Sequence, residues 1–433
     1  MSKAKWSIAK AFVCISFVVL LFQSPLSRSA LPEPFPSFFG LYDELVAGVF
    51  FIALIVYAIK RGIPKEYFKD VFLFLFFLGI GFAGTVLNDL QPLPAVFEDV
   101  VSCSKFAMAL YGVRVILRGT EAEEILRTLE RISYVLIAVL FALTIIDEML
   151  PNRLFENRGG GSGLHAAQLF YYHPSVLAQV SAMLLAVIST RPSKRNYGYR
   201  AMALTVLLAT LTSKALGFVF LYLFVCGYGK MKSGPAKAAI ALCAILCVAL
   251  VASSTLDEYY GNDASARYTL TADSIEIANE NAPIGLGFAT FGSAAAASHY
   301  SPVYIGLGYL AHYGLGYVST SYLTDTFWPA LFGEFGYLGT LAFIGVIFLI
   351  LKRCMSLSAI DRNAGVGALS IMGYLLISST AATAFFNPIS VSNAMVLGLS
   401  LSLAAPFASA NRVKARRQKS IRCAQYERKG VQR

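Results

Sequence analysis

Charge is scarce in this chain. Only 14% of its 433 residues are Asp, Glu, Lys or Arg, whereas 57% are hydrophobic. A soluble domain has roughly 25% charged residues. With a mean hydropathy of +0.62, a water-soluble fold of this size could not hide its apolar surface. The composition therefore excludes a soluble enzyme, a disordered scaffold and a disulfide-stapled secreted module, and it indicates that lipid surrounds most of the chain.

Signals for metal, disulfide or nucleotide chemistry are also missing. The seven cysteines lie mainly in apolar runs, and Cys243 and Cys247 have no other metal-ligand type nearby. They are predicted to be small packing residues, so neither a disulfide framework nor a metal site is expected. We find no internal repeat and no nucleotide fingerprint. No cofactor is expected.

Long apolar runs fill the rest of the chain. About 20 apolar residues cross the ~30 Å hydrocarbon core of a bilayer as a helix. Twelve runs are predicted to do so: 7–24, 44–60, 69–88, 102–118, 132–150, 174–190, 200–213, 215–229, 236–254, 328–351, 364–385 and 391–410. The predicted fold class is an all-α polytopic membrane protein with about twelve transmembrane helices. An even number of spans places both termini on one side.

The basic residues favour one orientation. With the N-terminus in the cytoplasm, all but six of the 36 Lys and Arg residues fall on the cytoplasmic side, as the positive-inside rule requires. The six exceptions are Arg28, Lys105, Arg153, Arg158, Lys214 and Arg267. This bias accounts for the net charge of +11 without nucleic acid. The first run also resembles a signal peptide; a retained helix is preferred, with cleavage as the alternative.

Two outer connections are long. The predicted organisation is 1–150 (about five transmembrane helices), 151–173 (first outer loop), 174–254 (central helices), 255–327 (large outer loop with short helices), 328–410 (C-terminal helices) and 411–433 (basic cytoplasmic tail). Long loops are uncommon unless they have a function. All four histidines lie in these two loops: His165, His173, His299 and His312. The chemistry is therefore predicted on the outer side.

The first outer loop contains a candidate anion site. Arg153 and Arg158 precede the glycine-rich stretch 159–163, and a helix is predicted to begin at Pro174, after His173. A helix N-terminus beside arginines suits a phosphate or carboxylate. Arg158, Arg153 and His173 are therefore candidate substrate ligands. The alternative is that the arginines lie among phospholipid headgroups.

Two further cations are candidates. Ser213 and Lys214 form a polar turn between two short apolar runs, and an ionisable residue close to membrane depth is a functional candidate by default. A lysine that snorkels to the interface is the alternative. Arg267 is the only basic residue in the loop 255–327, which makes it a candidate for binding an anionic group.

A proton acceptor is predicted near the tenth span. Asp325 lies directly before that span, where it could cap the helix or act as a general base. Glu334, His299 and His312 are weaker alternatives. The tyrosines and glycines of the same loop suit either sugar recognition or an interfacial aromatic belt.

Taken in order, these motifs resemble the O-antigen polymerase and ligase superfamily of bacterial envelope proteins. The resemblance covers about residues 40–405. Its motifs are Arg158 with His173-Pro174-Ser175, the turn Thr212 to Gly217, Arg267 followed by Pro283 to Phe291, and Asp325 to Gly339. It implies a GT-C-like fold and metal-independent glycosyl transfer from undecaprenyl-pyrophosphate-linked saccharides at the periplasmic face of the inner membrane. It also implies that Arg158 and Arg267 bind the pyrophosphate.

Two departures from the family pattern bear on function. A Ser-Arg-Gly turn becomes Ser213-Lys214-Ala215, and the position where ligases tend to carry His-Asn is Asp325-Thr326. The second departure favours a polymerase that joins lipid-linked repeat units, with donor and acceptor saccharides as substrates. A ligase acting on lipid A core or protein, a transporter or flippase of lipid-linked sugars, and a non-catalytic organiser of an export complex are the alternatives. Expected partners are the bilayer and the chain-length regulator and flippase of the same pathway.

Overall fold

The computed structural model describes residues 7–117, 119–150, 154–155, 165–193, 195–228 and 265–403. These residues are helical, with no strand among them. The helices before the large loop are α1 (Ile8–Ser27), α2 (Phe35–Gly40), α3 (Tyr42–Arg61), α4 (Phe68–Asn88), α5 (Leu93–Ile116), α6 (Thr120–Met149), η1 (Leu169–Tyr171), α7 (Pro174–Ser189), α8 (Asn196–Ala209) and α9 (Ser213–Tyr228). Those that follow are α11 (Ala266–Glu280), α12 (Ala294–Ser298), α13 (Pro302–Gly306), η2 (Tyr309–Ala311), α14 (Trp328–Ile360), α15 (Arg362–Ser378) and α16 (Pro388–Ser402).

Several of these helices are built to cross a membrane. Helices α1, α3, α4, α6 and α14 are long and apolar enough to do so, and α7, α9 and α16 are shorter apolar helices. The prediction of an all-helical, membrane-embedded chain is confirmed at this level. The predicted span 236–254 and the tail 411–433 lie outside the described residues.

Helix α5 differs from its predicted span. It begins at Leu93, well before the predicted 102–118. The missed part carries Glu98 and Asp99, whose charges interrupt the apolar pattern, and Lys105 lies inside the predicted span. Each of these side chains has a partner in the fold: Glu98 pairs with His299, Asp99 with the backbone of Ala289, and Lys105 with Asp43.

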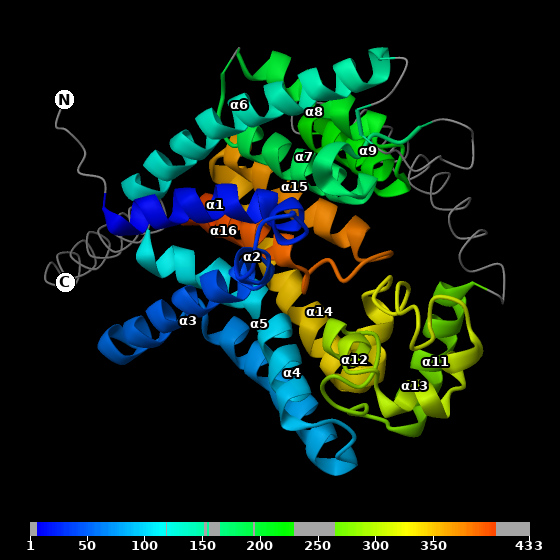
Figure 1. Ribbon diagram of the computed structural model, residues 1–433. Helices are drawn as coiled ribbons and strands as arrows, with labels where there is room; N and C mark the ends of the chain where they lie inside the picture. The colour runs from blue at the N-terminus through cyan, green and yellow to red at the C-terminus, as the bar shows by residue number, and fades with distance from the viewer. Residues whose placement is uncertain are drawn as a thin grey trace, which may run out of the picture.

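Helix α16 is the centre of the bundle. It packs against α1, α5, α6 and α15, and Figure 1 shows it surrounded by other helices. Nearly every residue of α16 is buried. Small side chains permit this close packing: a Cβ on Gly398 would lie 2.6 Å from the Leu110 carbonyl oxygen of α5. The hydroxyls of Ser392, Ser400 and Ser402 bond back to carbonyls of the helix itself.

Residues 265–327 form a separate lobe at one end of the bundle, drawn in yellow-green in Figure 1. Its core contains Leu270 and Ile277 of α11 together with Phe291, Tyr304 and Tyr309. The lobe packs along α14 through α11, and the Tyr337 hydroxyl of α14 donates to Asn279 Oδ1 at 2.6 Å. Residues 265–327 are therefore a folded unit that contains short helices.

A kink in α14 anchors this lobe. Gly336 has φ 59° inside the helix, which interrupts the helical hydrogen bonds and frees carbonyl groups. The amides of Leu286 and Gly287 fill these positions, donating to the carbonyl oxygens of Gly333 at 2.9 Å and Glu334 at 2.8 Å. Gly287, at φ 96°, has no room for a side chain because a Cβ would lie 2.2 Å from the Thr85 nitrogen. The segment Pro283 to Phe291 thus completes the broken helix.

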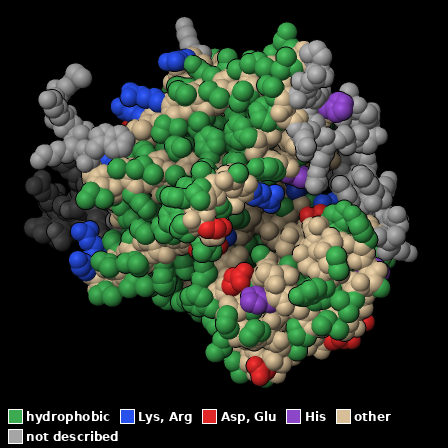
Figure 2. Space-filling model, viewed as in Figure 1, with side chains coloured by type: hydrophobic (Ala, Val, Ile, Leu, Met, Phe, Trp, Pro, Cys, Tyr) green, Lys and Arg blue, Asp and Glu red, His purple; other side chains and the backbone are tan. Residues whose placement is uncertain are grey.

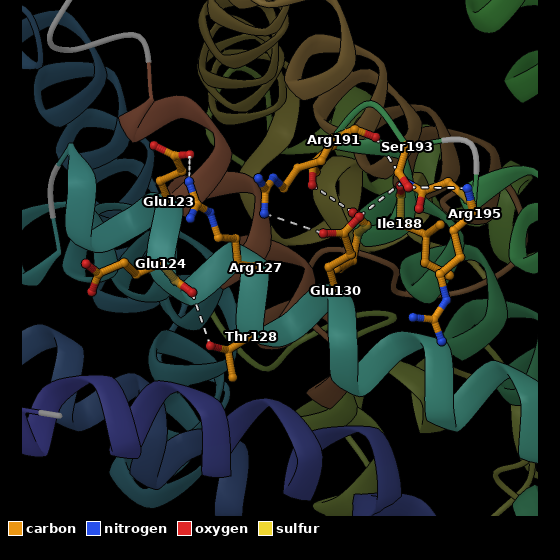
Figure 3. A network of polar contacts seen from close by, with 12 residues as sticks. Glu123, Glu124, Arg127, Thr128, Glu130, Ile188, Arg191, Ser193 and Arg195 are labelled. Atoms are coloured by element: carbon orange, nitrogen blue, oxygen red, sulfur yellow. Dashed lines mark hydrogen bonds and ion pairs between the residues drawn. The ribbon is translucent and has the colours of Figure 1, made fainter. Parts of the chain in front are cut away.

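The opposite end of the bundle carries a cluster of exposed and half-buried charges. Figure 3 shows it along the first half of α6 and the turn between α7 and α8. Arg127 Nη2 lies 2.6 Å from Glu123 Oε1, and Arg191 Nη1 lies 3.6 Å from Glu130 Oε2. Asn196 Nδ2 joins α6 to α7 by donating to Glu130 Oε1 at 3.1 Å and to the Ile188 carbonyl at 2.8 Å. These charges are far along the helices from the lobe.

Candidate functional site

Arg267 and Asp325 form an ion pair at the edge of the lobe. Arg267 lies in the first turn of α11, and Asp325 lies in the segment just before α14. Arg267 Nη2 is 3.0 Å from Asp325 Oδ2; the arginine side chain is 13% exposed and the aspartate side chain 34% exposed. Two residues that the sequence nominated separately are therefore in direct contact, and the carboxylate is open to solvent.

Lys214 belongs to the same neighbourhood. It is the second residue of α9, and its Nζ donates to the Ala381 carbonyl at 2.6 Å, in the connection between α15 and α16. Lys214 also lies within electrostatic range of Arg267 and Asp325. Helix α9, the lobe and the α15–α16 connection thus bring two cations and one carboxylate together. Figure 2 shows Lys, Arg, Asp, Glu and His side chains around a hollow between the helical body and the lobe.

His173 and Ser213 both lie at the start of a helix. His173 is the N-cap of α7, and its Nδ1 accepts a hydrogen bond from the Ser175 amide at 3.0 Å. This hydrogen bond gives the Ser175 amide at the start of α7 an acceptor, so the His173 ring stabilises the helix start. Ser213 is exposed at the start of α9, where Thr212 Oγ1, not Ser213, accepts from the Ala215 amide at 3.3 Å. Arg153 and Arg158 lie outside the described residues.

Glu334 does not fit the role of a proton acceptor for substrate. It is fully buried, and its Oε1 accepts from the Phe291 amide at 3.1 Å and from Ser293 Oγ at 2.7 Å. Its carboxyl group lies close to that of Asp99, another buried acid. Asp99 Oδ2 in turn accepts from the Ala289 amide at 2.8 Å. The two acids hold the segment 289–293 in place.

The tyrosines of the large loop fall into two groups. Tyr300, Tyr304 and Tyr309 are buried in the lobe core; the rings of Tyr304 and Tyr309 stack at 5.5 Å. Burial raises the pKa of the Tyr304 and Tyr309 hydroxyls, so both stay neutral. Tyr309 donates to Asp273 Oδ2 at 2.6 Å, and Tyr304 accepts from the Gly292 amide at 2.7 Å. These rings cannot stack on a sugar. Tyr313 and Tyr317 are exposed.

Lys105, Asp43 and Glu44 form a second charged cluster, which the sequence did not predict. Lys105 of α5 lies 2.6 Å from Asp43 Oδ2 and 3.5 Å from Glu44 Oε1 of α3, and Gln23 of α1 donates to Asp43 Oδ1 at 2.6 Å. Lys105 and Asp43 are almost fully buried. Buried charges are tolerated when they are paired and hydrogen-bonded, so this network joins three helices and neutralises one of the predicted outward cations. In the sequence, the only indication of this cluster is Lys105, a single charged residue in an apolar run.

An apolar groove of about 1230 Å³ runs between α3 and α4 over α5. Along α3 it is lined from Leu41 to Ile63, which is nearly the whole length of that helix. Its walls include Phe51 of α3, Phe74 of α4 and Met108 of α5. Polar residues occur near its two ends, with Glu44 and Glu98 at one and Asp70 at the other. The groove has the length and the apolar lining that a lipid chain requires.

The arrangement thus offers fixed cations, a solvent-accessible carboxylate and an apolar groove. Among the described residues no cluster of His, Cys, Asp and Glu could hold a metal ion. Comparison with models of known protein families and with curated proteins finds no match to this chain.

Proposed function

We propose that the chain is a polysaccharide polymerase that joins undecaprenyl-pyrophosphate-linked repeat units by glycosyl transfer. The observation that carries this proposal is the grouping of Arg267, Lys214 and Asp325, three residues from distant parts of the sequence. Two cations suit a diphosphate, and a neighbouring carboxylate suits a hydroxyl nucleophile. The resemblance of the sequence motifs to O-antigen polymerases supports the same reaction.

The proposed topology has twelve transmembrane helices in a GT-C-like fold. It places both termini in the cytoplasm and the lobe on the periplasmic side of the inner membrane. The helices described above and the distribution of Lys and Arg support this arrangement. In this orientation Arg267, Lys214 and Asp325 face the compartment in which lipid-linked repeat units are polymerised.

The proposed reaction is a displacement at the anomeric carbon of the donor. A hydroxyl oxygen of the acceptor saccharide forms a bond to that carbon, while the bond from the carbon to the diphosphate oxygen breaks. The bonding electrons leave with undecaprenyl pyrophosphate, whose negative charge grows in the transition state. Arg267 and Lys214 stabilise that charge because they are already in place before the reaction. Asp325 takes the hydroxyl proton, a contribution of typically ~10²–10⁴ in rate.

Loss of the gene tests this function. Without a polymerase, single repeat units are expected to replace long chains, because the units are still made but are no longer joined. The measurement is the size of the glycan and its attachment to the carrier lipid, compared with a complemented strain. Full-length chains stranded on the carrier would indicate a ligase instead, and unchanged surface glycan would contradict both activities.

The groove between α3 and α4 supports a substrate with a lipid chain. Gly48 lies in the groove wall with no atom within 4 Å of the position of an added Cβ. Replacing Gly48 with Phe is therefore expected to fill the groove without disturbing the fold. If the groove holds the polyprenyl chain, Gly48→Phe should lower polymer yield by about tenfold, which corresponds to ~1.4 kcal/mol. The yield is measured at equal amounts of membrane protein.

Gly79 is the matched control. It lies on α4, is exposed, and also has no atom within 4 Å of an added Cβ, but it is outside the groove lining. Gly79→Phe adds the same ring to a neighbouring helix and should leave the polymer unchanged. Equal yields from the two variants would show that the groove does not hold the substrate chain.

A further inference from the structure

One surface of the lobe is unusually apolar. The stretch 301–324 contains no Asp, Glu, Lys or Arg. Five of its large apolar or aromatic side chains are more than half exposed: Ile305 (55%), Leu310 (57%), Tyr313 (86%), Tyr317 (73%) and Val318 (101%). We call these five residues the lobe patch. Exposed apolar patches on a folded unit mark a surface that is covered by something.

The position of the lobe indicates what covers it. The lobe is fastened to the end of α4: the Phe288 amide donates to Thr85 Oγ1 at 3.0 Å, and Leu90, just after the helix, packs on the lobe core. Figure 1 shows the end of α4 beside the lobe. Because α4 is long enough to cross the bilayer, its end lies at the level of the lipid headgroups. The lobe is therefore held at the membrane surface.

The end of the bundle to which the lobe is fastened also exposes apolar side chains. At the same end of the bundle, Val86 and Leu87 of α4 and Leu93 and Phe97 of α5 are 70–81% exposed. Exposed apolar residues on membrane-spanning helices contact acyl chains. Tyrosine side chains are enriched at the boundary between acyl chains and headgroups because one end of the ring is apolar and the other is polar. A charge-free, tyrosine-rich patch fits this boundary.

We propose that the lobe patch inserts into the headgroup region of the adjacent leaflet and anchors the lobe to the bilayer. Arg267 belongs to the anchored unit, because Leu270 and Ile277 of the same helix are part of the lobe core. The anchor therefore sets the depth of Arg267 at the level of lipid phosphates. This role concerns membrane contact and does not depend on the glycosyl transfer proposed above.

Tryptophan fluorescence in vesicles tests the proposal. The chain has only two tryptophans. The fluorescence of an added tryptophan is therefore obtained by subtracting the fluorescence of the parent protein. Tyr313→Trp and Tyr317→Trp are made separately, and the full chain is reconstituted in vesicles of phosphatidylcholine and phosphatidylglycerol. Phosphatidylcholine brominated on its acyl chain near the ester is the quencher. The brominated lipid is expected to lower the fluorescence of the added tryptophan about twofold, because an aromatic ring at the interface lies close to the acyl chains.

Glu276→Trp is the matched control, because Glu276 is an exposed residue of the lobe on α11 and lies outside the patch. It should remain unquenched by brominated lipid and open to aqueous acrylamide. Adding Val318→Glu to Tyr313→Trp should weaken quenching, because a carboxylate resists transfer out of water. Acrylamide access without lipid quenching at both Tyr313→Trp and Tyr317→Trp would overturn the proposal. That result would point to a protein partner as the occupant of the patch.

Discussion

Replacing Arg267 with Ala is expected to abolish long glycan chains while the protein still reaches the membrane. The guanidinium is the cation in direct contact with Asp325, and its loss removes charge stabilisation from the departing diphosphate. Removing one fixed donor of this kind typically costs on the order of 10²–10³ in rate. Arg267→Lys keeps a point charge but loses the planar fork, so an intermediate chain length is expected. Glycan size on gels and the amount of protein in membranes are measured together.

The structure predicts that the fold survives this change. Asp325 would lose its partner, but its side chain is 34% exposed, so water can solvate the carboxylate. Arg127→Ala is the matched control: it removes the same charge from an exposed pair with Glu123 on α6, which Figure 3 shows from close by. Such pairs contribute only ~0.3–0.5 kcal/mol. Undiminished chain length in Arg267→Ala would refute the assignment of Arg267.

Replacing Glu334 with Ala is expected to give the largest loss of stability. The carboxyl group accepts from the Phe291 amide and the Ser293 hydroxyl in a fully buried position next to Asp99. Alanine would leave both donors without this acceptor, and an unsatisfied buried group costs about 1–3 kcal/mol. A lower midpoint of thermal unfolding in detergent and faster proteolysis within the lobe are the expected results.

Glu334→Gln separates the hydrogen bonds from the charge. The amide oxygen can still accept from Phe291 and Ser293, and the amide nitrogen can donate to the neighbouring Asp99 carboxyl. This variant should therefore unfold close to the parent midpoint. Glu98→Ala is the exposed control, since Glu98 is 51% exposed and pairs only with the half-exposed His299 among the ion pairs of the described residues. A stable Glu334→Ala protein would contradict the proposed fastening of the lobe.

The motif Pro283 to Phe291 illustrates the limit of sequence reading. It could be recognised as a family motif, and its glycines predicted a turn or a close backbone approach. Its task, however, is to supply amides to the carbonyls of Gly333 and Glu334 at the kink of α14. No local pattern links segments about fifty residues apart. The same holds for Glu334, whose position near the start of an apolar span suggested chemistry, although it is buried against Asp99.

The sequence by itself determined the class of the protein and the places of most of its helices. The length and apolarity of a run are local properties, and bilayer thickness converts them into membrane-spanning helices. Tertiary structure alone decided which side chains meet: Arg267 pairs with Asp325, His173 caps a helix, and the tyrosines are split between core and surface. It also placed Lys214 in the neighbourhood of the Arg267–Asp325 pair. These outcomes depend on how α9, the lobe, α14 and the α15–α16 connection pack, and packing is set by contacts between residues far apart in the chain.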